Sequence, residues 1–288
     1  MVFLHGLLSS RHDWDPVRER LDFPSVALDI PGFGDAEDVD NSRLSSFLLP
    51  LLGRIASLPY RDIVLVGHSL GGLLASRLCE YDPFARRIKA CVLIEPAGFG
   101  RLPAAEILAR KGALRRLAAL TSTLGIASLP VAEMIYMLFV GSPRKPLPLG
   151  LWRHIAWGAL IHRNGPAAAL KVIAREGRKG EKWQAKYLGD VVAVFGTKDH
   201  LVPLGHRYNL ARAYRKPSSI LVWDVHHHPQ QECPERVARL VESVATRVQK
   251  HRTRRRRLRR PNKTATCPSG YRDNIDRSGV RLAASKKR

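Results

Sequence analysis

The sequence predicts an α/β protein in which a mostly parallel sheet is covered by helices on both faces. Short apolar runs alternate with longer segments whose apolar residues recur at a helical period. This alternation is typical of parallel strands joined by crossover helices. The pattern breaks off near residue 99 and resumes near residue 190, as expected when a segment is inserted between two strands. With 288 residues, 45% of them hydrophobic, the chain is long enough for a core and an insert.

The same patterns assign the elements in order. Strands are predicted at residues 1–4, 25–28, 63–66, 88–94, 191–195 and 220–225. Helices are predicted at residues 15–21, 42–58, 70–81, 204–214 and 234–249. Pro16 suits the first turn of the first helix, whereas Pro50 predicts a kink in the second.

Residues 99–189 are predicted to form a helical insert. Strand patterns are missing there, and apolar residues recur at helical spacing in 104–120, 131–139 and 151–161. Residues 101–189 carry 15 Lys and Arg against 4 Asp and Glu, which indicates a solvated helix face or, alternatively, attraction of an anionic substrate. The predicted organisation is a core of residues 1–98 and 190–249, interrupted by a cap of residues 99–189.

Residues 250–288 form a basic tail that is predicted to be disordered. The tail holds 15 of the 48 Lys and Arg residues, against 2 Asp and Glu, and has no apolar period. Such a tail can bind polyanions non-specifically through their phosphates. Nothing in it, such as interleaved aromatic residues, indicates a specific nucleic-acid reader.

Composition argues against several other classes of protein. The four cysteines lie far apart, so neither a Cys-x-x-Cys metal site nor a redox motif is predicted. No run of eighteen apolar residues exists, so no transmembrane helix is expected. No signal peptide precedes the first strand, and we therefore expect a cytoplasmic protein. We also expect it to act without a metal or cofactor.

The segment Gly67-His68-Ser69-Leu70-Gly71 lies between a predicted strand and a predicted helix. A sharp strand-to-helix turn exposes the hydroxyl of Ser69 and leaves no room for side chains two positions away on either side. The alternative is a serine that only caps the helix. A serine nucleophile also needs a base to take its proton and a carboxylate to orient that base.

Candidate partners of Ser69 follow later strands, whose carboxyl ends meet at one edge of a parallel sheet. They are the acids Glu95 and Asp199 and the consecutive histidines His226, His227 and His228. Three adjacent histidines leave the base ambiguous. They do not predict a metal site, because Cys or carboxylate ligands at suitable spacing are missing nearby.

Five motifs, in this order, resemble those of the α/β-hydrolase superfamily. They are Val2-Phe3-Leu4-His5-Gly6, Asp29-x-Pro31-Gly32-x-Gly34, Gly67-His68-Ser69-Leu70-Gly71-Gly72, Gly196-x-x-Asp199-x-x-x-Pro203 and His227-x-Pro229. The resemblance covers about residues 1–249 and implies the α/β-hydrolase fold with a helical cap over the site. It implies Ser69 as nucleophile, Asp199 as orienting acid and His227 as base. The backbone N–H groups of Leu7 and Leu70 would form the oxyanion hole.

The resemblance leaves alternatives at three points. The His-x-Pro spacing selects His227 as base and leaves His228 as the alternative, while His226 departs from the family pattern, which has Gly there. Glu95 is the alternative acid, because some members place the acid there. The chain also begins inside a strand. We therefore expect either that the coding start is misplaced or that the first antiparallel strands of the fold are missing.

The function implied is a serine hydrolase that acts by acyl transfer on a small ester-like or related carbonyl substrate, apolar or anionic. Serine at the turn argues against relatives that carry aspartate there, such as haloalkane dehalogenases and epoxide hydrolases. A triad-dependent C–C hydrolase and a menaquinone-pathway synthase are alternatives. A non-catalytic protein whose basic tail binds nucleic acid is a further alternative.

Overall fold

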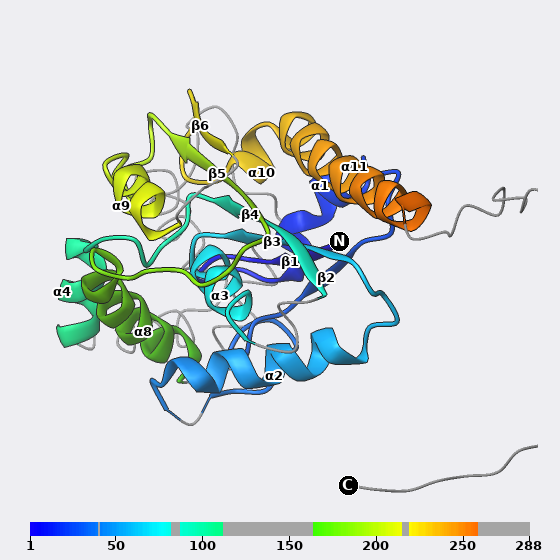
Figure 1. The fold of residues 1–288 in the computed structure, drawn as a ribbon. Helices are drawn as coiled ribbons and strands as arrows, with labels where there is room; N and C mark the ends of the chain where they lie inside the picture. The colour runs from blue at the N-terminus through cyan, green and yellow to red at the C-terminus, as the bar shows by residue number, and fades with distance from the viewer. Residues whose placement is uncertain (40, 82–86, 112–163, 215–218, 259–288) are drawn as a thin grey trace, which may run out of the picture. The chain divides into compact units, whose positions relative to one another are not determined.

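The computed structural model describes residues 1–39, 41–81, 87–111, 164–214 and 219–258 (Figure 1). The chain divides into a unit of residues 1–250 and a second unit of residues 251–288. The helices expected at 131–139 and 151–161 lie outside the described residues, as does most of the basic tail.

Six strands form one parallel sheet in the order β2-β1-β3-β4-β5-β6. Their bounds are β1 Val2–Leu4, β2 Val26–Leu28, β3 Ile63–His68, β4 Ile88–Ile94, β5 Asp190–Gly196 and β6 Ser219–Trp223. All six predicted strands are confirmed, with ends shifted by at most two residues. The register pairs Leu4 with Gly67, Gly67 with Leu93 and Leu93 with Ala193, so the carboxyl ends of β1, β3, β4 and β5 reach the same edge.

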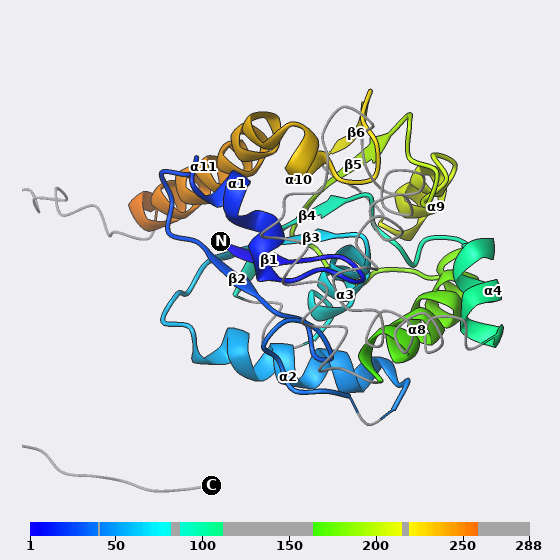
Figure 2. The ribbon, with the colours of Figure 1, turned by 180° about the vertical axis from the view of Figure 1, so that it is seen from behind.

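Helices cover both faces of the sheet (Figures 1 and 2). Their bounds are a 3-10 turn η1 Arg11–Trp14, α1 Asp15–Arg18, α2 Leu44–Ser57, α3 Leu70–Leu78, α4 Pro103–Lys111, α8 Gly165–Gly180, α9 His206–Ala213, α10 Pro229–Glu232 and α11 Pro234–Leu258. Helices α2, α3 and α8 lie on one face, and α1 and α11 lie on the other. Helix α11 runs nine residues past its predicted end, because Arg and Lys sustain a helix after the apolar period stops.

The two faces of the sheet build two apolar clusters. In β3, Leu65 packs with the cluster under α2 and α3, whereas its neighbours Val64 and Val66 pack with the cluster under α1 and α11. Burial on both faces is why the strands read as continuous apolar runs rather than alternating ones. Trp14 and Phe3, both fully buried, contact each other in the second cluster with ring centroids 5.0 Å apart and ring planes tilted by 47°.

The described ends of the predicted cap are helical. Helices α4 and α8 pack on each other, and α8 buries Ala169, Val172 and Ile173 in the same cluster as α3. A Cβ on Gly180 would lie 2.0 Å from the carbonyl oxygen of Gly98, so the end of α8 closely approaches the segment after β4. Among the residues that the structure describes, no helix is long and apolar enough to cross a membrane.

Candidate active site

Ser69 lies in the turn between β3 and α3, with φ of 50° and ψ of −112°. Residues other than glycine seldom adopt this backbone conformation, because it is strained. Such strain is typical of turns at functional sites. The Ser69 N–H donates to the carbonyl of Ile94 at 3.0 Å. A Cβ on Gly67 would lie 2.2 Å from the carbonyl oxygen of Gly71, and one on Gly71 would lie 2.3 Å from that of Leu4. Glycine at both positions is therefore what lets the strand and helix meet so closely.

His227 and Asp199 meet in the loops that follow β6 and β5. Nδ1 of His227 lies 2.7 Å from Oδ2 of Asp199, and both side chains are buried. The other carboxylate oxygen accepts the backbone N–H groups of Leu201 at 2.7 Å and Val202 at 3.0 Å. Burial acts to raise the pKa of Asp199, but the charge and hydrogen bond of His227, together with hydrogen bonds from Glu95 and the Val202 backbone, hold the pKa below its ordinary value. An ionised Asp199 keeps the proton of the ring on Nδ1 and leaves Nε2 to accept one.

Glu95, the competing acid, is fully buried beside Asp199. Its backbone has a φ of 44°, and a Cβ on Gly196 would lie 2.6 Å from its Oε1 atom, so the glycine at the end of β5 makes room for the carboxyl. Burial, followed by the charge of Asp199, raises the pKa of Glu95 well above its usual range. The structure thus pairs His227 with Asp199 and buries Glu95, whose pKa is raised, next to that pair.

The three consecutive histidines face different partners. His226 donates its backbone N–H to Glu232 at 2.8 Å, and its Nδ1 lies 3.2 Å from the same carboxylate. Nδ1 of His228 lies 3.9 Å from Oδ1 of Asp13. Burial, and then the charge of His227, lowers the pKa of His228 well below its usual range. Of the three rings, the one that reaches Asp199 is therefore that of His227.

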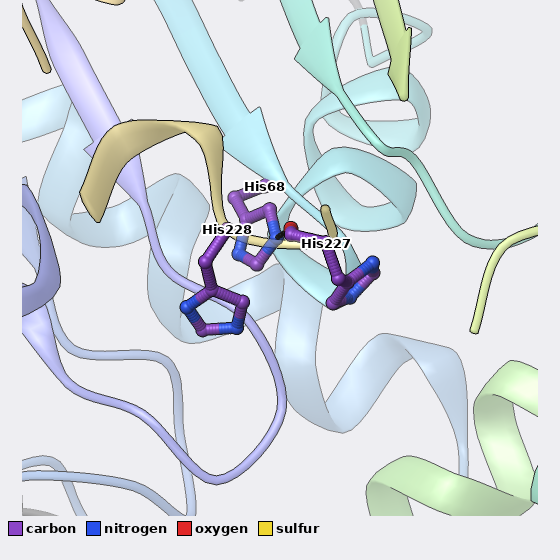
Figure 3. A group of neighbouring side chains, drawn as sticks. All are labelled: His68, His227 and His228. Carbon is purple, nitrogen blue, oxygen red and sulfur yellow. Dashed lines mark hydrogen bonds between the residues drawn. The ribbon is translucent and has the colours of Figure 1, made fainter. Parts of the chain in front are cut away.

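His68, at the end of β3, joins the turn of Ser69 to the loop of His227. Its Nε2 atom donates to the carbonyl oxygen of His227 at 2.6 Å, and its ring centre lies 4.8 Å from that of His227 and 4.6 Å from that of His228 (Figure 3). Burial, and then the charges of His228 and His227, lowers the pKa of His68 well below its usual range. A neutral His68 holds the two segments together.

The segment after β1 lies beside the turn. A Cβ on Gly6 would lie 2.8 Å from Nδ1 of His68 and 3.4 Å from Cβ of Ser69. The backbone of Gly6, the residue before Leu7, therefore lies close to Ser69. Leu70 is the first residue of α3 and is fully buried. The assignment of these two backbone N–H groups to an oxyanion hole stays a prediction.

Two other motif residues organise loops. Nε2 of His5 accepts the N–H of Ile30 at 3.0 Å, while its Nδ1 lies 2.7 Å from the carbonyl oxygen of Gly6. Asp29 accepts the backbone N–H of Arg11 at 2.6 Å and that of Asp35 at 3.1 Å, and it also pairs with the Arg11 guanidinium. These contacts give His5 and Asp29 structural roles.

Sequence reasoning missed a buried polar group behind the histidines. The carboxyl of Asp13 is fully buried and accepts the side-chain amides of Gln230 at 2.8 Å and Gln231 at 3.0 Å. One of its oxygens lies 3.9 Å from Nδ1 of His68, and the other lies at the same distance from Nδ1 of His228. No local pattern signals this group, since its members come from distant parts of the chain.

Comparison with known proteins identifies the family to which the sequence matches and individual relatives that match part of the chain. A family described as the alpha/beta hydrolase family matches residues 1–240. The 2-succinyl-6-hydroxy-2,4-cyclohexadiene-1-carboxylate synthase of Yersinia pseudotuberculosis is 37% identical over 76 residues, which are 26% of this chain and 28% of that protein. A putative synthase of the same name from Haemophilus influenzae is 35% identical over 105 residues, which are 35% and 41% of the two chains. The chain thus spans less than half the length of these relatives.

Solved structures match over most of the chain. An esterase of Thermogutta terrifontis has a TM-score of 0.64 at 21% identity and covers 86% of this chain and 89% of its own. The enol-lactonase of Burkholderia xenovorans LB400 has a TM-score of 0.63 at 18% identity and covers 85% and 90% of the two chains. At these identities, the likeness shows a shared fold.

Proposed function

The chain belongs to the alpha/beta hydrolase family, and from this membership we propose that it is a serine hydrolase acting on a small ester-like or related carbonyl substrate. The observation that carries the proposal is the buried 2.7 Å contact between His227 and Asp199, in a protein whose Ser69 occupies a strained strand-to-helix turn. In this assignment Ser69 is the nucleophile, His227 the base and Asp199 the orienting acid. His228 and Glu95 then have no direct part in proton transfer.

The mechanism follows from these roles. Nε2 of His227 takes the hydroxyl proton as Oγ of Ser69 attacks the carbonyl carbon. The N–H groups of Leu7 and Leu70 stabilise the negative charge that develops on the carbonyl oxygen. The intermediate collapses, the leaving alcohol takes the proton from His227, and an acyl group remains on Ser69. Water, deprotonated by His227, then attacks the acyl carbon. The bond to Oγ of Ser69 breaks, Oγ takes the proton back from His227, and the acid is released.

A fluorophosphonate probe tests this proposal, because it reacts with activated serine hydroxyls. The folded protein is expected to gain one label, located on the peptide of Ser69 by mass spectrometry, and Ser69→Ala is expected to gain none. Ser57→Ala, which removes an exposed hydroxyl at the end of α2, is the matched control and is expected to label normally. Equal labelling of Ser69→Ala and the unaltered protein would falsify the assignment.

A synthase is the second candidate, favoured by the curated relatives that are 35% and 37% identical over part of the chain. In such a reaction, His227 would remove a proton from the substrate and an elimination would follow. The two candidates separate in parallel assays of ester hydrolysis and of formation of the product for which those synthases are named. If the unaltered protein forms that product but does not hydrolyse esters, and His227→Gln forms none, the synthase is favoured. If the unaltered protein hydrolyses esters but does not form that product, and His227→Gln hydrolyses none, the hydrolase is favoured.

Some expectations rest on residues outside the described part of the chain. They are the apolar or anionic preference attributed to the cap, and the binding of polyanions by the tail. Each stays a prediction. Measuring the DNA affinity of the full chain and of residues 1–249 over a range of salt concentrations tests the second one, because phosphate contacts make affinity depend on salt.

A further inference from the structure

Three histidine side chains gather beside the turn of Ser69, although the sequence places one of them far from the other two. His68 ends β3, whereas His227 and His228 lie between β6 and α10 (Figure 3). Each ring offers one nitrogen, and these nitrogens lie within 4.8 Å of one another. All three side chains are buried.

Two of the rings already make the kind of second hydrogen bond that metal-binding histidines make. Such a histidine almost always gives its second ring nitrogen to a carboxylate or to a backbone carbonyl, which fixes the ring and its tautomer. His227 gives Nδ1 to the carboxylate of Asp199 at 2.7 Å. His68 gives Nε2 to the carbonyl oxygen of His227 at 2.6 Å. The lone pairs of these rings are therefore on Nε2 of His227 and Nδ1 of His68.

A carboxyl group lies close to two of the nitrogens. The oxygens of Asp13 lie 3.9 Å from Nδ1 of His68 and 3.9 Å from Nδ1 of His228. The hydrogen bonds that hold this carboxyl come from the neutral amides of Gln230 and Gln231. An ionised Asp13 would stabilise a positive charge held between the histidines.

We propose that His68, His227 and His228 form a binding site for a divalent transition-metal ion of the zinc class. Imidazole nitrogens suit zinc, copper and nickel, whereas magnesium and calcium take oxygen ligands. Tetrahedral zinc with bonds of about 2.0–2.1 Å needs nitrogens about 3.4 Å apart. The three nitrogens, which lie within 4.8 Å of one another, must therefore move closer by up to about 1.4 Å when a metal binds.

A metal at this site inhibits the enzyme. It occupies the Nε2 lone pair of His227, which the proposed hydrolase needs to take the proton of Ser69. The inhibition therefore rests on the proposed function, whereas metal binding does not. Measuring both separates a failure of the metal site from a failure of the hydrolase assignment.

The test measures zinc affinity by competition with a fluorescent chelator, in the full chain carrying Ser69→Ala so that turnover plays no part. We expect one zinc ion per chain, and His228→Gln is expected to weaken binding at least about tenfold, because even the loss of a residue that only supports a ligand costs 10–100-fold. His226→Gln is the matched control, since its ring faces Glu232. This variant is expected to bind as the parent does.

Two further measurements complete the test. X-ray absorption at the zinc edge of the otherwise unaltered protein is expected to show histidine nitrogens at about 2.0–2.1 Å, whether or not the variants fold. With Ser69 restored, zinc is expected to abolish the hydrolase activity, and a chelator is expected to restore it. The proposal is overturned if no imidazole is bound to the zinc, or if His228→Gln and His226→Gln bind zinc equally. Zinc binding without inhibition overturns the inhibitory role alone.

Discussion

Replacing Glu95 by Gln tests the reasoning that this buried acid keeps its proton. The change retains size and shape and removes the ability to ionise. Burial and the Asp199 carboxylate raise the pKa of Glu95 above its ordinary 4.5. The unfolded chain therefore loses a proton near pH 4.5, which the folded protein still holds at higher pH.

The size of the effect follows from this difference. The stabilising contribution of Glu95 is fully present below pH 4.5 and is lost as the pH rises towards the folded pKa. The free energy of unfolding falls by about 1.4 kcal/mol per pH unit as long as the folded protein holds one proton more than the unfolded chain at this group. Glutamine has no such proton, so the free energy of unfolding of Glu95→Gln, relative to the unaltered protein, is expected to increase at about that rate.

Urea unfolding at pH 5, 6 and 7 measures this difference. Glu19→Gln, the same chemical change at an exposed position, is the matched control for effects of net charge. The curve for Glu95→Gln is expected to rise more steeply than that for Glu19→Gln. A curve that is flat or falls with pH would mean that Glu95 is ionised in the folded protein, and the argument for its protonation would be wrong.

Two other predictions concern the site and its turn. Asp199→Asn is expected to lower kcat on a chromogenic ester by about 10⁴-fold, because His227 loses the partner that fixes its tautomer, whereas Glu95→Gln is expected to cost less than tenfold; the opposite order would make Glu95 the orienting acid. Gly71→Ala is expected to destabilise the protein by at least about 2 kcal/mol in thermal unfolding, because its Cβ would lie 2.3 Å from a backbone oxygen. Gly53→Ala, in α2 with open space around it, is expected to stabilise by about 0.5–1 kcal/mol, and equal effects of the two changes would refute the steric account.

The order of strands and helices was predictable because its signals are local. The apolar run of β3 and the glycines on either side of Ser69 can be recognised within a few consecutive residues, although the space at Gly71 is limited by Leu4. The end of α11 was placed too early, because Arg and Lys continue a helix without any apolar period.

Among the candidate site residues, the sequence by itself determined the residue types and their order. Serine in the turn, an acid after β5 and a histidine after β6 are local features of strand ends. Only the tertiary structure decided between neighbours, by directing His227 towards Asp199 and His228 towards Asp13, and by burying Glu95 beside Asp199. These choices depend on distances between segments far apart in the chain, for which no short pattern in the sequence carries a signal.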